Sequence, residues 1–253
     1  MRLNPEHLSH RDKVILSGLF LSKYDDEGLK RLGFDTFAEA FNSVGYALGS
    51  RPMTIKNYRD EFDPLFRNPR KGWHKRPIRD YCRAVLNEYR DLPLHDFAGL
   101  ITSFVGDDEN IWTQFRVEAT GSERESTFAK RLITGLAAER YFQSVQPTVA
   151  EFTGYELEDT TKIGCGYDFR LNKPGNEFLA VEVKGLKERT GTISLTPREY
   201  DAAVSYSDRF FLFVVKNFQE SPFHELYRNP VLGRLHFVRR EAVVIHTSWH
   251  STV

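Results

Sequence analysis

The sequence of 253 residues has only two cysteines, Cys82 and Cys165, which are far apart and lack the spacing of metal ligands or of a disulfide framework. It also has no run of eighteen apolar residues, so we expect no membrane-spanning helix. Its first residues lack the apolar stretch of a signal peptide. These absences favour a reducing compartment, and we expect a cytoplasmic protein with no membrane partner.

Several catalytic motifs are missing too. There is no glycine-rich phosphate loop with a lysine-serine tail, and no Gly-x-Ser-x-Gly nucleophile elbow. Of the eight histidines, only His246 and His250 are four residues apart, and no glutamate follows His246 as a His-Glu-x-x-His zinc motif would require. The sequence therefore supports neither a Walker-type nucleotide site nor a zinc hydrolase.

The formal net charge is zero, but the charges are distributed unevenly. Residues 51–90 contain eleven Lys or Arg against five Asp or Glu, an excess of six positive charges. The rest of the chain carries the matching negative excess. A basic segment beside a carboxylate-bearing one is compatible with phosphate binding combined with metal chemistry.

Residues 13 to about 103 show apolar residues at three- and four-residue spacing, which predicts a helical domain over residues 1–105. Within it, residues 49–52 separate two predicted helices. Asp35 is the expected N-cap of the first helix, and Thr54 is the expected N-cap of the second. A helix, a tight break and a second helix form the outline of a helix-turn-helix.

The second helix and the basic loop after it carry side chains suited to DNA. Arg and Asn can read base edges, and further Lys and Arg suit backbone phosphates. A tryptophan in the loop either stacks on a base or pins the loop to the domain. The alternative is a helical bundle with a cationic face, and three nearby acidic residues count against uniform groove contact. The candidate DNA-binding residues are Lys56, Asn57, Tyr58, Arg59, Arg67, Arg70, Lys71, Trp73, Lys75 and Arg76.

Residues 106–121 are expected to form a connector, and residues 122–253 a second domain. A long helix over 122–145 is followed by strand-like runs at 166–171, 178–184 and 209–218. Between the last two, residues 195–206 predict a helix with Thr196 as N-cap and Pro197 at its first position. Further strand-like pieces lie at 234–240 and 242–246. The order of helices and strands predicts an α+β or α/β fold.

One strand in this second half carries the strongest functional signal. Glu182 and Lys184 are two residues apart and share one face, while Val181 and Val183 point into the core on the other. If the strand over 166–171 pairs with it, Asp168 joins them at the sheet edge. Two carboxylates and an amine there suit a hard divalent cation and an activated water. The alternative is a solvated salt pair on an edge strand.

Asp, followed by Glu-x-Lys on an adjacent strand within a helix-strand-strand-helix-strand order, resembles the PD-(D/E)xK restriction-endonuclease-like nucleases. More specifically, residues 122–216 resemble the nuclease-like domain named for the plant NO VEIN protein, which occurs in bacterial restriction settings. The resemblance implies a mixed-sheet catalytic domain. Tyr167, where the superfamily pattern has proline, is a minor departure.

This resemblance implies a role for each matching residue. Asp168 and Glu182 would be metal ligands, with the carbonyl of Val183 completing the protein's share of the coordination. Lys184 would orient or deprotonate the attacking water. Glu139 matches an acidic helix residue near the metal, with a solvated glutamate as the alternative. The implied metal is Mg²⁺, with Mn²⁺ as a substitute.

We expect, on these grounds, a Mg²⁺-dependent, site-specific DNA endonuclease of the type II restriction kind. Its partners would be double-stranded DNA and a second copy of the chain in a homodimer. Arg198, at the start of the helix over 195–206, is a further candidate phosphate contact. Two alternatives stay open: a DNA-binding regulator with a catalytically inactive nuclease-like domain, and a repair or structure-specific nuclease.

Overall fold

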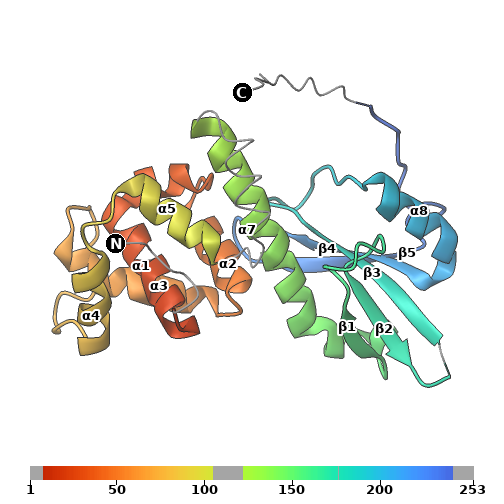
Figure 1. Cartoon of the computed structure of the whole chain (residues 1–253), viewed down its shortest axis with the longest axis horizontal. Coiled ribbons are helices and arrows are strands. Elements are labelled where there is room, and N and C mark those ends of the chain that lie inside the picture. The colour runs from red at the N-terminus through yellow and green to blue at the C-terminus, as the bar shows by residue number, and fades with distance from the viewer. Residues whose placement is uncertain (1–7, 105–121, 176, 242–253) are drawn as a thin grey trace, which may run out of the picture.

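The structure, a computed structural model, describes residues 8–104, 122–175 and 177–241. The helical N-terminal part lies at one end of the molecule (Figure 1). Its elements are α1 (His10–Arg31), α2 (Phe37–Ala47), α3 (Pro52–Phe62), the 3-10 helix η2 (Asp63–Leu65), α4 (Asp80–Tyr89) and α5 (Leu94–Ser103). The predicted helical character of this part is confirmed. The predicted connector lies outside the described residues.

The second part is a mixed five-stranded sheet flanked by helices, which confirms the predicted α+β class. The sheet order is β1-β2-β3-β4-β5, antiparallel throughout except for the parallel pair β3 and β4. The elements are α7 (Ser122–Val145), η3 (Gln146–Thr148), η4 (Ala150–Phe152), β1 (Glu156–Asp159), β2 (Phe169–Lys173), β3 (Glu177–Gly185), α8 (Pro197–Tyr206), η5 (Ser207–Arg209), β4 (Phe210–Lys216) and β5 (Phe223–Arg228).

The three predicted main strands correspond to β2, β3 and β4, and the predicted helix with Thr196 as N-cap is α8. The strand predicted at 234–240 is wrong, because these residues have no regular structure. The strand predicted at 242–246 lies outside the described residues. Neither β1 nor β5 was predicted; both are edge strands whose residues are mostly half-buried or exposed.

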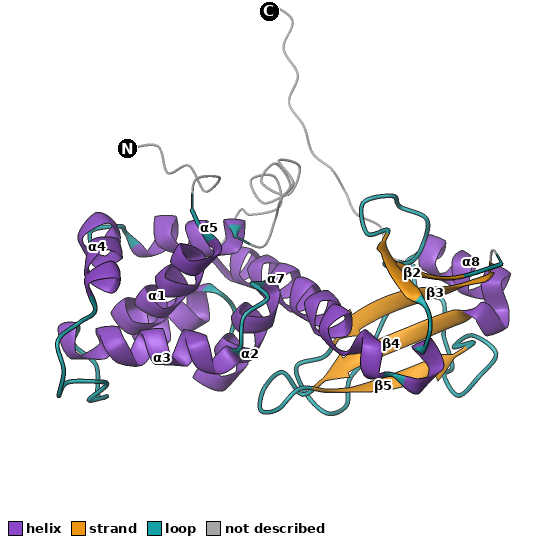
Figure 2. Cartoon of the chain, turned by 90° about the horizontal axis from the view of Figure 1, so that it is seen from below, coloured by secondary structure: helices purple, strands orange, loops and turns teal. Residues whose placement is uncertain are grey.

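Helices α7 and α8 cover opposite faces of the sheet, as Figure 2 shows. Val181 and Val183 of β3 belong to the large core that includes Phe142 of α7. Ala180 belongs instead to a smaller cluster with Ala203 of α8. The alternation along β3 therefore follows the predicted two-residue period, with odd residues toward α7 and even residues toward α8.

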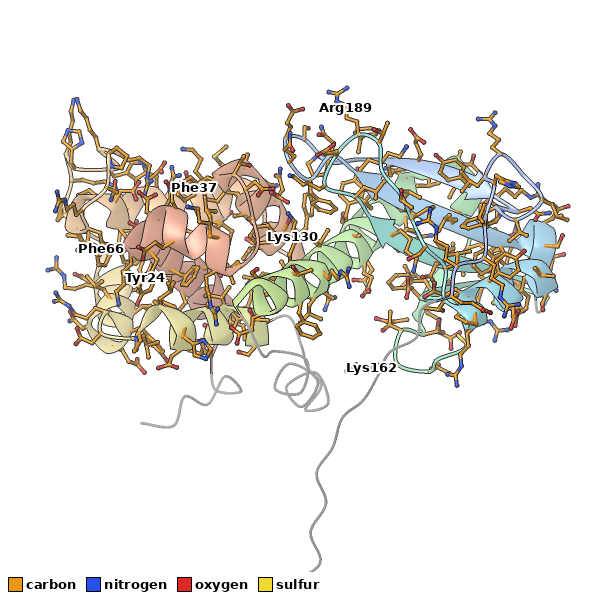
Figure 3. All side chains as sticks on the ribbon, turned by 90° about the horizontal axis from the view of Figure 1, so that it is seen from above. Tyr24, Phe37, Phe66, Lys130, Lys162 and Arg189 are labelled. Carbon is orange, nitrogen blue, oxygen red and sulfur yellow. The ribbon has the colours of Figure 1, made fainter. Side chains whose placement is uncertain are left out.

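The long helix α7 also packs on α2, so one helix contacts both parts of the chain. Lys130, on α7 where it meets the helical part (Figure 3), forms an ion pair with the buried carboxylate of Glu39 at 2.8 Å. The amide of Asn42 on α2 donates to the carbonyl of Phe218 at 2.8 Å, just after β4. A single hydrophobic cluster runs through both parts. Among the described helices, none combines the length and apolar character needed to cross a membrane.

The break between α2 and α3 is present, but the caps differ from those expected. Thr36 rather than Asp35 caps α2, because its hydroxyl accepts from the N–H of Glu39. Helix α3 begins at Pro52, so Thr54 lies inside it. Gly18 of α1 lies so close to α3 that a Cβ there would be 2.4 Å from the Cβ of Tyr58. The Tyr58 side of α3 therefore faces the interior.

Candidate active site

The site forms where β2 begins beside the middle of β3. Along β2, the first residue that pairs with β3 is Phe169, which lies opposite Val181. Asp168 therefore lies one residue before the pairing starts. Its backbone N–H donates to the carbonyl of Val181 at 3.1 Å. Its side-chain Oδ2 accepts from the backbone N–H of Val183 at 2.9 Å. Asp168 thus continues the antiparallel ladder with its carboxylate and stays next to Glu182.

The Glu-x-Lys pair of β3 is held on the face toward α8. Glu182 is only 2 % exposed. Lys184 Nζ donates to Glu182 Oε1 at 2.5 Å and to Glu199 Oε2 at 2.9 Å. Burial would lower the pKa of Lys184, but the carboxylates of Glu182 and Glu199 outweigh burial and raise it. Lys184 is therefore an ammonium at neutral pH, held between two carboxylates.

Glu139 approaches the same place from α7. Burial and the nearby charges of Asp168 and Asp159 raise the pKa of Glu139 to about 8. Burial also raises the pKa of Asp168 to about 6, although the Val183 N–H and Lys184 act against it. The pKa of Glu182 is raised by burial and by the charge of Asp168. Three carboxyl groups therefore crowd one partly dry region, where like charges disfavour ionisation.

The carbonyl of Val183 faces the same end of the ladder. In antiparallel pairing, a residue that donates its N–H to one neighbouring strand also directs its carbonyl there. Because the N–H of Val183 points to Asp168, its carbonyl lies on the open side beyond the start of β2. Asp168, Glu182 and Val183, which the sequence singled out together, are therefore brought together in space.

A tight turn joins the site to the start of α8. Gly166 adopts a φ of +89°, and a Cβ there would lie 2.6 Å from the carbonyl oxygen of Arg198. A side chain at this position would therefore push α8 away. The guanidinium of Arg198 itself reaches toward Gly164, with Nη1 3.5 Å from the Cβ position of that glycine. Arg198 is exposed beside the turn that leads to Asp168.

The candidate DNA-binding residues of the helical part differ widely in solvent exposure. Arg59 is buried, and Lys56, Asn57, Tyr58, Arg70 and Trp73 are half-buried. Arg67, Lys71, Lys75 and Arg76 are exposed. Glu61 points inward, because it is buried and pairs with Arg76 and Arg79. Glu61 would therefore not repel DNA phosphates, although the sequence alone counted it against uniform groove contact.

Several of these cations are used inside the protein. Arg59 pairs with Asp60 at 2.6 Å and with Asp63 at 3.5 Å, and lies over the rings of Phe37 and Phe41. Arg70 pairs with Asp63 at 2.9 Å and also with Asp25. Lys56 pairs with Asp60 at 2.7 Å. These contacts make Arg59 and Arg70 parts of the domain's structure.

Trp73 also has an internal role. Its ring lies beneath the guanidinium groups of Arg76 and Arg79, at 4.3 and 5.6 Å. Its backbone N–H donates to the carbonyl of Asp60 at 2.7 Å. Of the two alternatives for this residue, the contacts favour pinning the loop to the domain.

Two residues near the site were missed by the sequence analysis. Glu199 lies in the helix predicted over residues 195–206 but was not among the candidate site residues, because its contact with Lys184 depends on how α8 packs across β3. Asp159 raises the pKa values of Glu139 and Asp168 from the end of β1. It was overlooked because β1 itself was not predicted. The Thr-x-x-Glu spacing was the one available signal for Glu199.

The fold and the site define an α+β domain in which two carboxylates and a lysine meet at the end of paired strands. Within this domain, residues 138–228 match the family model described as Protein NO VEIN, C-terminal. The matched stretch runs from α7 to the end of β5 and includes Glu139, Asp168, Glu182, Lys184 and Glu199. It supports a NO VEIN-like domain in this part of the chain. No curated protein and no solved structure matches the chain.

Proposed function

We propose that this protein is a Mg²⁺-dependent endodeoxyribonuclease that hydrolyses phosphodiester bonds of double-stranded DNA. The observation that carries the proposal is the meeting of Asp168, Glu182 and Lys184 where β2 begins beside β3. The match to the NO VEIN family is compatible with a nuclease-like domain. We further propose that the target is foreign DNA, cut at specific sites in the manner of a restriction enzyme.

The donor set fits a hard divalent cation. Carboxylate and carbonyl oxygens are the ligands that Mg²⁺ prefers, and one or two carboxylates with water and substrate phosphate complete its octahedron. No three His, Cys, Asp or Glu side chains among the described residues form a metal-holding group by themselves. The proposed protein ligands are therefore Asp168, Glu182 and the Val183 carbonyl. Mn²⁺ accepts the same oxygen donors.

The crowded carboxyl groups support this assignment. Burial first, and then neighbouring carboxylates, raise the pKa values of Asp168 and Glu139, so that ionised carboxylates are disfavoured at this place unless a positive charge is added. A divalent cation supplies that charge and favours the ionised carboxylates. When bound, it would lower the pKa of a coordinated water and polarise the scissile phosphate.

The protein's own groups then have distinct roles. Asp168 is fixed by the Val183 N–H, so its free oxygen has a defined direction. Lys184, as an ammonium, donates hydrogen bonds and stabilises negative charge that develops on the phosphate, which favours an orienting role over that of a base. Glu139 approaches from the opposite face of the sheet and would hold water or a proton near the metal.

DNA would be held by exposed cations. Within the described residues, no ion pair engages Arg67, Lys71 or Lys75, which lie in the loop after η2. Arg198 lies at the start of α8, close to the site. Such side chains neutralise backbone phosphates and supply affinity without reading sequence.

The proposal is tested with methylated and unmethylated plasmid and phage DNA, incubated with Mg²⁺, Mn²⁺ or EDTA. We expect discrete fragments from the wild type only with the metal ions. Asp168→Asn and Lys184→Ala should give none, whereas Lys173→Ala, an exposed lysine at the far end of β2, should cleave normally. Branched and single-stranded DNA are included as further substrates. Absence of metal-dependent cleavage on every substrate would overturn the proposed activity.

A further inference from the structure

The contact between α8 and the Glu-x-Lys strand places a second carboxylate beside the lysine, in addition to that of Glu182. Glu199 Oε2 accepts from Lys184 Nζ at 2.9 Å and from the backbone N–H of Thr196, also at 2.9 Å. The side chains of Glu199 and Lys184 are 17 % and 23 % exposed. The contact is therefore partly shielded from water, where a charge-assisted hydrogen bond is stronger than at an open surface.

The start of α8 holds Glu199 in place. Thr196 and Glu199 form a complete capping box, and Pro197 occupies the first helical position. The carbonyl of Arg198 packs against Gly166 in the turn before Asp168. The first turn of α8 is thus tied both to β3, through Lys184, and to the segment that leads into β2.

The two carboxylates around Lys184 differ in their other interaction partners. Glu182 is a proposed metal ligand, so a bound cation would compete with the ammonium for its oxygens. Glu199 lies on the helix side, and its second partner is a backbone N–H. It can therefore keep hold of the ammonium when Glu182 turns to another partner.

We propose that Glu199 is a positioning residue that fixes the ammonium of Lys184 beside the reacting phosphate. The proposal rests on the proposed function in so far as Lys184 acts on the phosphate. Glu199 does not touch the substrate in this scheme. It limits the positions open to a long, flexible side chain, which otherwise has Glu182 as its only carboxylate partner in the described site.

A single substitution separates this role from helix capping. Glu199→Gln keeps an amide oxygen that can accept from the Thr196 N–H, but it removes the negative charge that holds Lys184. The matched control is Thr196→Ala, which removes the hydroxyl that accepts from the Glu199 N–H at 3.3 Å and leaves the contact with Lys184. An effect that came only from a weakened helix start would appear in both variants.

The first measurement is steady-state cleavage of plasmid DNA with Mg²⁺, together with thermal unfolding. For Glu199→Gln we expect kcat to fall about ten- to a hundredfold, because small misplacements of a reacting group have effects of this size. KM and the unfolding temperature should stay close to the wild-type values. Thr196→Ala should keep a kcat close to wild type. A wild-type kcat in Glu199→Gln, or an equal loss in Thr196→Ala, would overturn the positioning role.

The second measurement does not need activity. The ¹⁵N signal of the Lys184 ammonium, assigned by its absence in Lys184→Arg, reports whether that group is ordered. We expect an ordered ammonium in the wild type and a mobile one in Glu199→Gln. If the wild type cleaves no DNA but this difference is seen, the proposed nuclease function fails, while the finding that Glu199 fixes the Lys184 ammonium stands. Equal order in both proteins would overturn the positioning role, whatever the activity.

Discussion

The carboxylate of Asp168 acts as a backbone acceptor for Val183, whose N–H donates to Oδ2 at 2.9 Å. The contact lies one residue before β2 pairs with β3, where the ladder would otherwise leave that N–H without a strand partner. Val183 is 7 % exposed, so water offers little replacement. Asp168 therefore has two roles that substitution can separate: completing the sheet and supplying a negative charge.

Asp168→Asn should keep the first role and lose the second. An amide oxygen can still accept from Val183, so we expect a folded protein that binds DNA and does not cleave it. Asp168→Ala should be less stable than Asp168→Asn by about 1–3 kcal/mol, the usual cost of an unpaired buried donor. Urea unfolding of the two variants measures the difference. Equal stabilities would show that the hydrogen bond to Val183 contributes nothing.

Glu139 should make the protein less stable as the pH rises. Its pKa is about 8 in the folded protein, above the ordinary value of 4.5 for glutamate, so the folded state holds the proton more tightly than the unfolded state. This contribution is complete below about pH 4.5 and is lost as the pH rises toward 8.

The variant Glu139→Gln should not lose this stability as the pH rises, because glutamine does not ionise. The variant should therefore gain about 1–3 kcal/mol over the wild type between pH 5 and pH 8, measured by urea unfolding without metal. Glu177→Gln, an exposed glutamate at the start of β3, serves as the control and should follow the wild-type pH dependence. Parallel curves for Glu139→Gln and the wild type would contradict the prediction.

Gly166 and Gly164 provide a matched test of how closely α8 must approach the site. Both have a positive φ, +89° and +71°, so alanine is strained at either position. Only at Gly166 would the new Cβ lie against backbone, 2.6 Å from the carbonyl oxygen of Arg198. We expect Gly166→Ala to cost about 1–3 kcal/mol more than Gly164→Ala and to lower cleavage more strongly. Denaturant unfolding and plasmid cleavage check the two effects, and equal losses would count against a close contact.

The sequence predicted the central part of the fold because its elements carry strong local signals. β3 and β4 are runs rich in Val and Phe, and Thr196-Pro197 marks the start of α8. β1 reads Glu-Leu-Glu-Asp, with no apolar alternation, so its strand form depends on pairing with β2. In the segment 234–240, apolar and polar residues alternate as in a strand, but the segment forms no strand in the structure.

The convergence of Asp168, Glu182 and Lys184 was predictable because period-two geometry and one hairpin place them together. The contact of Glu199 with Lys184 was not, since it depends on the packing of α8 across the sheet. The same limit applies to Arg59. Its residue type suggested base reading, yet the close approach of α1 at Gly18 turns that side of α3 inward. Sequence spacing gives a helix face but not which neighbour covers it.

Two groups of cations in the helical part should therefore respond differently to substitution. Arg59 is 8 % exposed and pairs with Asp63, whose side chain is fully buried, so Arg59→Met should destabilise the protein by about 2–4 kcal/mol. Replacing exposed Arg67, Lys71 and Lys75 together by alanine should leave urea unfolding unchanged. It should weaken DNA binding and reduce the slope of log affinity against log salt by up to about 3, because each lost phosphate contact removes nearly one unit. Each variant is the control for the other, and an unchanged salt slope in the triple variant would place the DNA contacts elsewhere on the protein.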